Sequence, residues 1–99
     1  IENAGAFSIV LECLTPTASA LVTKNLSIPT IGIGSSSNCD GQILVTDDML
    51  GISGFYPKFV KKYASLDTTI EKAVKKYTRD VKKGNFPLKK NFLNGTKLR

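Results

Sequence analysis

Glu12 is the residue of this chain whose type and position could do chemistry. It follows the apolar stretch FSIVL within FSIVLEC, residues 7–13, which is short and rich in β-branched residues and therefore predicts a buried strand. A carboxylate at a strand end is often only a partly exposed side chain that faces a loop. In a barrel of parallel strands, however, that end opens on the active site, where a carboxylate can act as a general base. The residues alone leave both interpretations open.

A glycine-rich loop follows the second apolar run. Its residues GIGSSS place Gly32, Gly34 and Ser37 at a spacing close to a dinucleotide-binding fingerprint. Such a site needs a helix that begins at the glycines, because the N-terminal amides of the helix bind the phosphate. Here NCDGQILV follows, which predicts another loop and strand. The order of elements therefore disfavours nucleotide binding.

Three acidic residues near strand ends could supply oxygen ligands for a hard cation: Asp40, Asp47 and Asp48. Asp47 and Asp48 are adjacent, so regular structure does not easily direct both at one ion. We therefore favour loop capping and surface solvation over metal binding. The chain has no His, and Cys13 and Cys39 lack CxxC spacing, so the pattern of a zinc site is absent.

Composition limits the class of protein. The 99 residues are 41% hydrophobic and 22% charged, which is typical of one small globular domain or part of a larger one. No apolar run approaches the roughly 18 residues of a membrane-spanning helix. Two cysteines are too few for a disulfide scaffold, so we expect reduced thiols and a cytoplasmic location. The start IENAGAF lacks an initiator Met and a signal-peptide pattern, from which we expect a native chain that extends upstream.

Charge is distributed unevenly along the chain. Residues 1–57 contain one Lys and five acidic residues, whereas residues 58–99 contain thirteen Lys or Arg and three acidic residues. Such a basic segment could bind nucleic acid through phosphate contacts. It has no recognisable reading motif, so a solvated helix face is the preferred interpretation. The basic residues of the predicted helix are Lys72, Lys75, Lys76, Arg79, Lys82 and Lys83.

The elements that must position these residues follow the order of an α/β protein with parallel strands. After the first strand, Thr15 is a good N-cap and Pro16 a good first residue for a helix that continues to about residue 25. Residues 28–34 predict a second strand and residues 42–45 a third. The apolar side of the helix is expected to comprise Ala18, Leu21 and Val22.

The clearest helix of the chain is predicted over residues 66–84. Asp67 or Thr68 can cap it, and Thr68 and Glu71 have the spacing of a capping box. Gly84 is a natural stop at the C-terminal end. The apolar stripe of this helix comprises Ile70, Ala73, Val74, Tyr77 and Val81.

The remaining segments carry weaker patterns. Residues 46–57 indicate a loop or a short helical turn, residues 58–64 (KFVKKYA) a brief helix, and residues 85–99 a loose tail. Three buried strands need cover on both faces, and two substantial helices supply too little of it. The sequence therefore predicts a piece of a larger α/β fold.

Three stretches together resemble ketopantoate hydroxymethyltransferase, also called 3-methyl-2-oxobutanoate hydroxymethyltransferase: GAFSIVLEC, SIPTIGIGSSSNCDGQILVTDDMLG and YPKFVKKYA. The likeness runs in one order and spacing from about Glu2 to Pro87. It implies the C-terminal part of a (β/α)8 TIM barrel of the phosphoenolpyruvate/pyruvate type, with about the last three strands and the closing helices. Residues 1–87 would belong to that single domain, and residues 88–99 would form a divergent, loose tail.

The resemblance also implies a reaction. The family adds a hydroxymethyl group from 5,10-methylenetetrahydrofolate to 3-methyl-2-oxobutanoate, which gives ketopantoate for pantothenate and coenzyme A biosynthesis. Glu12 matches the family's general base. Ile33, Ile43 and Val45 match positions around the branched end of the substrate, a role that does not exclude plain core packing. Mg²⁺ binds the keto acid in the family, and its ligands are expected upstream, so no metal ligand is assigned in this chain.

Partners follow from the same resemblance. We expect a homo-oligomer with no nucleic-acid or membrane partner, and a fragment that is inactive alone. The chain departs from the family pattern in three places: GSS stands for the common GAG at residues 34–36, Asp47 precedes DMLG where a His or a small residue is frequent, and PLKKNFLN replaces the usual acidic ending at residues 87–94. The alternatives are a non-catalytic remnant and a small basic nucleic-acid-binding module.

Overall fold

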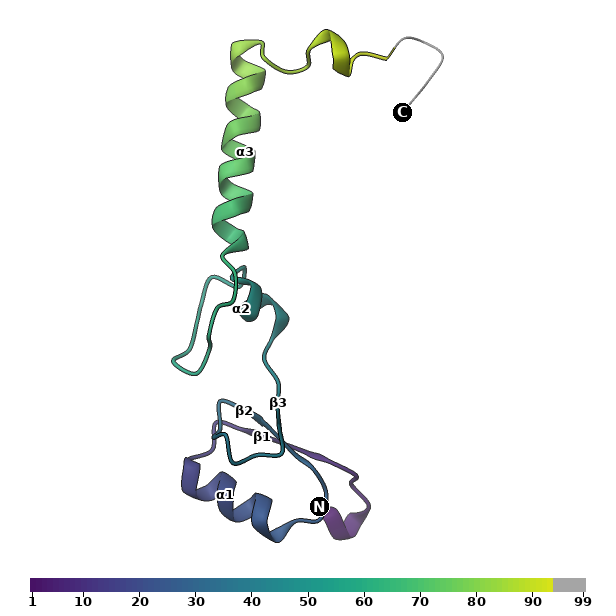
Figure 1. Cartoon of the computed structure of the whole chain (residues 1–99), viewed down its shortest axis with the longest axis vertical. Coiled ribbons are helices and arrows are strands. Elements are labelled where there is room, and N and C mark those ends of the chain that lie inside the picture. The colour runs from purple at the N-terminus through teal and green to yellow at the C-terminus, as the bar shows by residue number, and fades with distance from the viewer. Residues whose placement is uncertain (94–99) are drawn as a thin grey trace. The chain divides into compact units, whose positions relative to one another are not determined.

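The computed structural model describes residues 1–93 of the chain. The chain divides into two compact units, Ile1–Ala64 and Ser65–Arg99. The first unit contains a sheet and the second a long helix (Figure 1). The elements are, in order, η1 (Glu2–Ala4), β1 (Ile9–Glu12), α1 (Pro16–Asn25), β2 (Thr30–Ile33), β3 (Gly41–Gln42), α2 (Thr46–Leu50), α3 (Leu66–Lys83) and η2 (Lys89–Asn91).

The three strands form one parallel sheet in the order β1-β2-β3. The register places Glu12 opposite Ile33. In the central strand, Gly32 lies opposite Leu11 on one side and Gln42 on the other. Helix α1 connects β1 to β2, as a parallel pair requires (Figure 1). The α/β class and the parallel sheet predicted from the sequence are confirmed.

Helix α1 begins where the sequence predicts. Thr15 Oγ1 caps the first turn by accepting a backbone amide at 3.2 Å, and Pro16 occupies the first position, where a helix has no use for an N–H group. The predicted apolar side is wrong at Leu21, which is 61% exposed, whereas Ser19 is fully buried. The Ser19 hydroxyl forms a 2.7 Å hydrogen bond with that of Ser36. A polar contact therefore joins this helix to the loop after β2.

Strand β3 is shorter than the strand predicted over residues 42–45, because it comprises Gly41–Gln42 alone. The amide of Ile43 still donates to the central strand at 3.0 Å, and the chain then leaves the sheet. The carbonyl of Val45 accepts the N–H of Met49 at 2.9 Å. Val45 is therefore the N-cap of α2 rather than part of β3. Helix α2 is the short helical turn that the sequence predicts.

The brief helix predicted over residues 58–64 is wrong. A single turn forms, in which the amide of Val60 donates to the carbonyl of Pro57 at 2.9 Å. The amide of Tyr63 donates instead to the carbonyl of Met49 in α2, at 2.8 Å. Because this backbone donor is satisfied by another segment, the chain runs back along α2 rather than winding into a helix.

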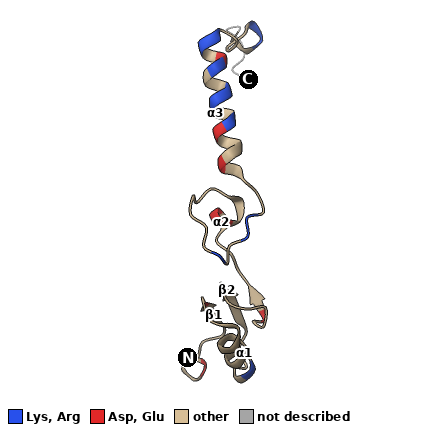
Figure 2. Cartoon of the chain, turned by 90° about the vertical axis from the view of Figure 1, so that its left-hand side faces the viewer, with Lys and Arg blue, Asp and Glu red and all other residues tan. Residues whose placement is uncertain are grey.

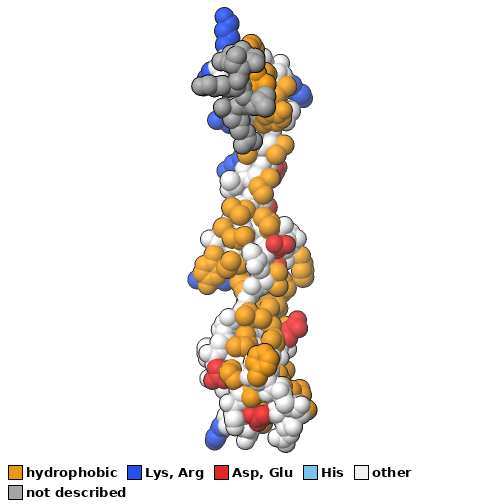
Figure 3. Space-filling view, turned by 90° about the vertical axis from the view of Figure 1, so that its right-hand side faces the viewer, with side chains coloured by type: hydrophobic (Ala, Val, Ile, Leu, Met, Phe, Trp, Pro, Cys, Tyr) orange, Lys and Arg blue, Asp and Glu red, His pale blue; other side chains and the backbone are white. Residues whose placement is uncertain are grey.

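The core of the described chain is small. Two apolar side chains are buried, those of Leu11 and Cys39. Two polar side chains, those of Ser19 and Thr30, are fully buried. The prediction that β1 is buried on both faces is wrong for this chain, since Val10 is 54% exposed. Apolar side chains lie at the surface along much of the chain (Figure 3). The sheet thus presents apolar surface for which the described residues supply no cover.

In the second unit, α3 forms where predicted, but its N-terminal cap differs. The residue before the helix is Ser65, which makes no side-chain capping bond. Asp67 accepts the amide of Thr68 at 2.7 Å inside the first turn, so neither residue is the N-cap and the predicted capping box is wrong. Gly84 ends the helix with a φ of 74°, as predicted, because glycine adopts this left-handed conformation without a side-chain clash.

The apolar side of α3 is exposed. Its large apolar residues are Leu66, Ile70, Val74, Tyr77 and Val81. Beyond the helix, Phe86 meets the Tyr77 ring edge to face, with a centroid distance of 5.8 Å. No helix in residues 1–93 is both long enough and apolar enough to cross a membrane.

The segment after α3 contains the short turn η2. The amide of Leu88 donates to the side-chain oxygen of Asn91 at 3.0 Å. The loose tail predicted over residues 88–99 lies partly outside the described residues, because residues 94–99 are not described. The domain boundary after residue 87 stays a prediction.

Candidate functional site

The candidate residues gather at the carboxyl edge of the parallel sheet. Strand β1 ends at Glu12 and β2 at Ile33, and these two residues are direct register partners. Residues 13–15 leave the edge after β1, and residues 34–40 leave it after β2. In α/β proteins with parallel strands, ligands bind at this edge.

Glu12 is exposed at the end of β1, and its side chain forms no hydrogen bond or ion pair with another described residue. The backbone turns directly after it. The amide of Cys13 donates to the carbonyl of Ile33 at 2.9 Å, and Cys13 has a φ of 55°, which is uncommon for a residue other than glycine. The turn leaves the carboxylate accessible at the sheet edge. Cys13 is an exposed free cysteine and Cys39 a buried one.

Ser35 joins this turn to the loop after β2. Its hydroxyl donates to the carbonyl of Leu11 at 2.8 Å and accepts from the amide of Leu14 at 3.1 Å. These two backbone groups lie on either side of Glu12 and Cys13 in the chain. No role was predicted for Ser35 from the sequence. The available signal was the run of serines that follows Gly34 at the end of the second predicted strand.

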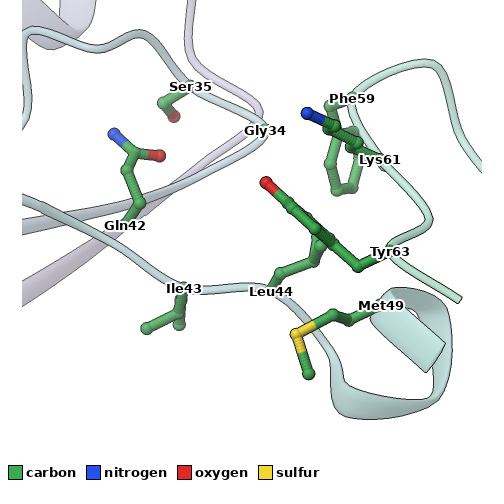
Figure 4. Close-up of a pocket in the computed structure, with 9 residues that line it drawn as sticks. All are labelled: Gly34, Ser35, Gln42, Ile43, Leu44, Met49, Phe59, Lys61 and Tyr63. Atoms are coloured by element: carbon green, nitrogen blue, oxygen red, sulfur yellow. The ribbon is translucent and has the colours of Figure 1, made fainter.

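A cavity of about 440 Å³ lies beside the same loop, within the first unit (Figure 4). Its apolar side chains are Ile43, Leu44, Met49 and Phe59. Its polar side chains are Ser35, Gln42, Lys61 and Tyr63. An apolar wall with a few convergent polar groups is typical of a site for a small organic ligand. The ammonium of Lys61 makes an acid the favoured kind of ligand.

Hydrogen bonds and ring contacts hold the polar side of the cavity. Gln42 Nε2 donates to the carbonyl of Ser36 at 2.9 Å. Lys61 Nζ lies 5.0 Å from the ring centroid of Tyr63. In Figure 4 the Tyr63 side chain extends from the segment after α2, and its hydroxyl group points toward Gly34. The side chains after α2 therefore face the loop after β2 across the cavity.

Gly34 shows why this loop approaches the segment after α2 so closely. Its φ is 63°, and a Cβ at this position would lie 2.9 Å from carbons of the Phe59 ring. Glycine is therefore required both for the backbone conformation and for the space. Phe59, Lys61 and Tyr63 were not predicted as site residues from the sequence, because a helix over residues 58–64 would have set Lys61 on the side opposite Phe59 and Tyr63.

The three predicted wall residues separate in the structure. Ile43 lines the cavity. Ile33 and Val45 are not among its lining residues: Ile33 ends β2 opposite Glu12, and Val45 is 51% exposed just before α2. The shared face predicted for Ile43 and Val45 requires a strand that contains both residues, whereas β3 ends at Gln42. The contact of Ile33, Ile43 and Val45 with substrate stays a prediction.

Of the three acidic residues, Asp40 bonds the backbone, the loop-capping role that the sequence favours. Asp40 Oδ2 accepts the amide and the hydroxyl of Thr30, at 2.8 and 3.2 Å. Asp47 and Asp48 lie in the first turn of α2, where negative charge is favourable. Among residues 1–93, no group of three or more His, Cys, Asp or Glu side chains is placed to hold a metal ion.

The basic residues of the second unit are spread along α3 (Figure 2). They are exposed, and Lys75 forms an ion pair with Glu71 one turn earlier. Pairs of this kind are typical of a solvated helix surface. The geometry gives no further support to the nucleic-acid alternative.

Comparison with known proteins concerns the same part of the chain. The family described as ketopantoate hydroxymethyltransferase matches residues 1–89. The 3-methyl-2-oxobutanoate hydroxymethyltransferase of Syntrophus aciditrophicus is 58% identical over 88 residues, which are 88% of this chain and 32% of the relative. The proteins of the same name from Anaplasma marginale (strain Florida) and Enterococcus faecalis are 60% identical over 85 residues and 57% identical over 88. These matches cover 86% and 88% of this chain, and 31% and 32% of the relatives. The chain therefore spans about a third of the length of these curated relatives.

Proposed function

We propose, because this chain belongs to the ketopantoate hydroxymethyltransferase family, that it forms the part of such an enzyme that provides the general base. The reaction would transfer a hydroxymethyl group from 5,10-methylenetetrahydrofolate to 3-methyl-2-oxobutanoate and give ketopantoate. The observation that supports this proposal is the position of Glu12, exposed at the carboxyl edge of a parallel sheet. Ser35, which lines the cavity, bonds the backbone on both sides of that residue.

Glu12 is the proposed base for the hydrogen on C3 of the keto acid. The neighbouring carbonyl acidifies this position, because it delocalises the charge that develops when the proton leaves. The Glu12 carboxylate accepts the proton, and the C–H electron pair forms the enolate. The enolate attacks the bridging methylene carbon to form a C–C bond, and one folate nitrogen leaves with the electrons of its C–N bond and takes the proton from Glu12. A water molecule then supplies the hydroxyl group: its oxygen bonds the same carbon, the second C–N bond breaks, and the second nitrogen takes a proton of the water as tetrahydrofolate leaves. The Glu12 carboxylate has no described partner to release before it takes the proton.

The cavity is proposed to receive part of a substrate. Ile43 and Met49 offer an apolar surface for the branched end of the keto acid, and Lys61 offers a positive charge for an acid group. Ile33 and Val45 stay predictions for the wall around the same branched end. The keto acid and the folate both bear carboxylates, so the position of Lys61 alone does not choose between them.

The proposed whole enzyme contains more than the described residues supply. We propose that β1, β2 and β3 are three of the eight strands of a (β/α)8 barrel of the phosphoenolpyruvate/pyruvate type, and that the enzyme assembles as a homo-oligomer. Mg²⁺ is the expected cofactor, but residues 1–93 contain no cluster that fits it. Its ligands would come from other parts of the barrel.

A hybrid enzyme tests the proposal. Residues 1–89 of this chain replace the matching segment of the Enterococcus faecalis relative, to which this chain is 57% identical over 88 residues. The hybrid is expected to make ketopantoate from 3-methyl-2-oxobutanoate and methylenetetrahydrofolate. The substitution Glu12→Gln removes the base and is expected to lower kcat by about 100- to 10,000-fold, with binding of the keto acid retained.

The control is Asp47→Asn, a second exposed carboxylate changed to its amide, which is expected to leave kcat close to that of the hybrid. Steady-state kinetics measure turnover, and calorimetry measures keto-acid binding. Normal turnover by the Glu12→Gln variant would show that the assigned base is wrong.

A second candidate is that the 99-residue chain alone is non-catalytic. It is favoured by the absence of a metal-binding cluster in residues 1–93 and by the small number of buried apolar side chains there. The two candidates are separated by assaying the chain alone beside the hybrid. Ketopantoate formation by the chain alone would exclude this second candidate.

A further inference from the structure

We infer that the side of the cavity formed by Phe59, Lys61 and Tyr63 binds the aminobenzoylglutamate part of the folate, with the ammonium of Lys61 paired to a glutamate carboxylate. The inference rests on the second substrate of the proposed function. The three residues stand at alternate positions of the segment after α2, and all of them line the cavity. Two aromatic rings and one positive charge therefore border the same space.

The charge of Lys61 is available to a ligand. Its Nζ lies 5.0 Å from the ring centroid of Tyr63, and it forms no ion pair with any residue that the structure describes. Residues 49–66 contain Lys58, Lys61 and Lys62 but no acidic residue. Because this segment supplies no carboxylate of its own, an anionic ligand is favoured there.

The keto acid is proposed to occupy a different side of the cavity. Figure 4 shows Ile43 and Lys61 on opposite sides, with Lys61 on the segment after α2. In 3-methyl-2-oxobutanoate a single carbon separates the carboxylate from the branched carbon C3. A molecule this short, with C3 beside Glu12 and its methyl groups against Ile43, does not extend across a cavity of about 440 Å³ to reach Lys61 as well.

The folate has the size and the chemistry that this side of the cavity lacks a partner for. Cavities of about 300–1,000 Å³ accommodate ligands of drug size, and the keto acid alone is far smaller. Aminobenzoylglutamate joins an aromatic ring, which can pack against Phe59 and Tyr63, to carboxylates that can pair with Lys61. The one-carbon unit lies at the opposite end of this group from the glutamate. A glutamate bound at Lys61 therefore leaves that unit free to reach the sheet edge where Glu12 lies.

The first test measures both KM values of the hybrid enzyme with Lys61→Gln, Lys61→Arg and Lys62→Gln. Lys61→Gln removes the charge and is expected to raise the KM for methylenetetrahydrofolate by about three- to fivefold, the effect of losing an ion pair at an exposed site. The KM for the keto acid should change little. Lys61→Arg keeps the charge and should restore the KM for the folate. Lys62→Gln is the control and should match the hybrid, because it makes the same change at an exposed residue that does not line the cavity.

The second test uses p-aminobenzoylglutamate as a probe. It is expected to compete with methylenetetrahydrofolate for the hybrid enzyme, whereas its dimethyl ester, which has no carboxylate, should compete more weakly. In the Lys61→Gln variant the two compounds are expected to compete equally, because the charge that distinguishes them is gone.

Two results would overturn the inference. A rise in the KM for the keto acid alone would assign Lys61 to the other substrate. Unchanged KM values, with the probe and its ester still distinguished by the Lys61→Gln variant, would show that Lys61 pairs with neither. In both cases the proposed function stands if Glu12→Gln lowers kcat. Normal turnover by Glu12→Gln would contradict the proposed base, and the KM and probe comparisons would still decide the folate site by themselves.

Discussion

Thr30 is fully buried in the central strand, and both its amide and its hydroxyl donate to the carboxylate of Asp40. A buried polar group left without a partner costs about 1–3 kcal/mol, so this contact has a clear structural purpose. It closes the loop of residues 34–40 back onto β2, and the same loop presents Ser35 to the turn after Glu12. At the residue scale, the candidate site is held by short polar contacts between backbone and side chain.

Gly34→Ala tests how closely this loop must approach its neighbour. The matched control is Gly54→Ala, because both glycines have positive φ values, 63° and 80°, while only Gly34 has an atom within 4 Å of the added Cβ. Gly54→Ala is expected to cost about 1–2 kcal/mol for the left-handed conformation alone. Gly34→Ala should cost more, because its Cβ would lie 2.9 Å from the Phe59 ring. Urea unfolding of the hybrid variants measures both, and equal losses would contradict the contact.

At the scale of elements, local capping decides where α1 begins, and polar contacts decide how it is placed. The helix has Thr15 as its N-cap and Pro16 as its first residue, a combination that is legible in the sequence. Its buried contact is the hydroxyl of Ser19, which lies against Ser36 seventeen residues away. An apolar stripe calculated from helical spacing does not detect such a contact.

Thr15→Ala is expected to destabilise the hybrid enzyme by about 1 kcal/mol, because it leaves an amide of the first turn of α1 without its cap. Thr17→Ala is the control. It makes the same chemical change at an exposed position of the same helix, where the side chain has no bond among the described residues. Denaturant unfolding measures the difference. Equal effects of the two substitutions would show that the capping bond contributes nothing to stability.

At the scale of the whole molecule, apolar surface exceeds what the described residues cover. Val10 in β1 and the apolar side of α3 are exposed, while the buried apolar side chains of residues 1–93 are Leu11 and Cys39. Folding must offset roughly 1–2 kcal/mol of backbone entropy for each ordered residue. A core of this size contributes little toward that cost, so stable folding is expected to require the other parts of the proposed barrel.

The chain alone is therefore expected to bind a dye specific for exposed apolar surface and to lose its structure without a sharp thermal transition. The hybrid enzyme is the control and should unfold cooperatively with little dye binding. Fluorescence and circular dichroism during heating measure the two properties. A cooperative transition of the chain alone, without dye binding, would show that it folds independently.

The sequence by itself determined the properties that depend on neighbouring residues. Strand and helix periodicity, the Thr15 cap and the Gly84 stop predicted β1, β2, α1, α3 and their parallel α/β order, and the quoted motifs identified the family. The capping of α3, the brief helix over residues 58–64 and the length of β3 were predicted wrongly. In the last two cases a backbone bond to α2 decides the outcome. Val45 accepts the amide of Met49 instead of extending β3, and Tyr63 donates to the carbonyl of Met49 instead of forming a helix.

Only the tertiary structure decided which distant side chains meet. The contact of Ser35 with the backbone around Glu12, and that of Phe59 with Gly34, join residues more than twenty positions apart. No local spacing encodes such a pair, because the loop that brings it together is shaped by several elements at once. The sequence could therefore propose Glu12 as a base, whereas the tertiary structure was needed to show what holds its turn in place.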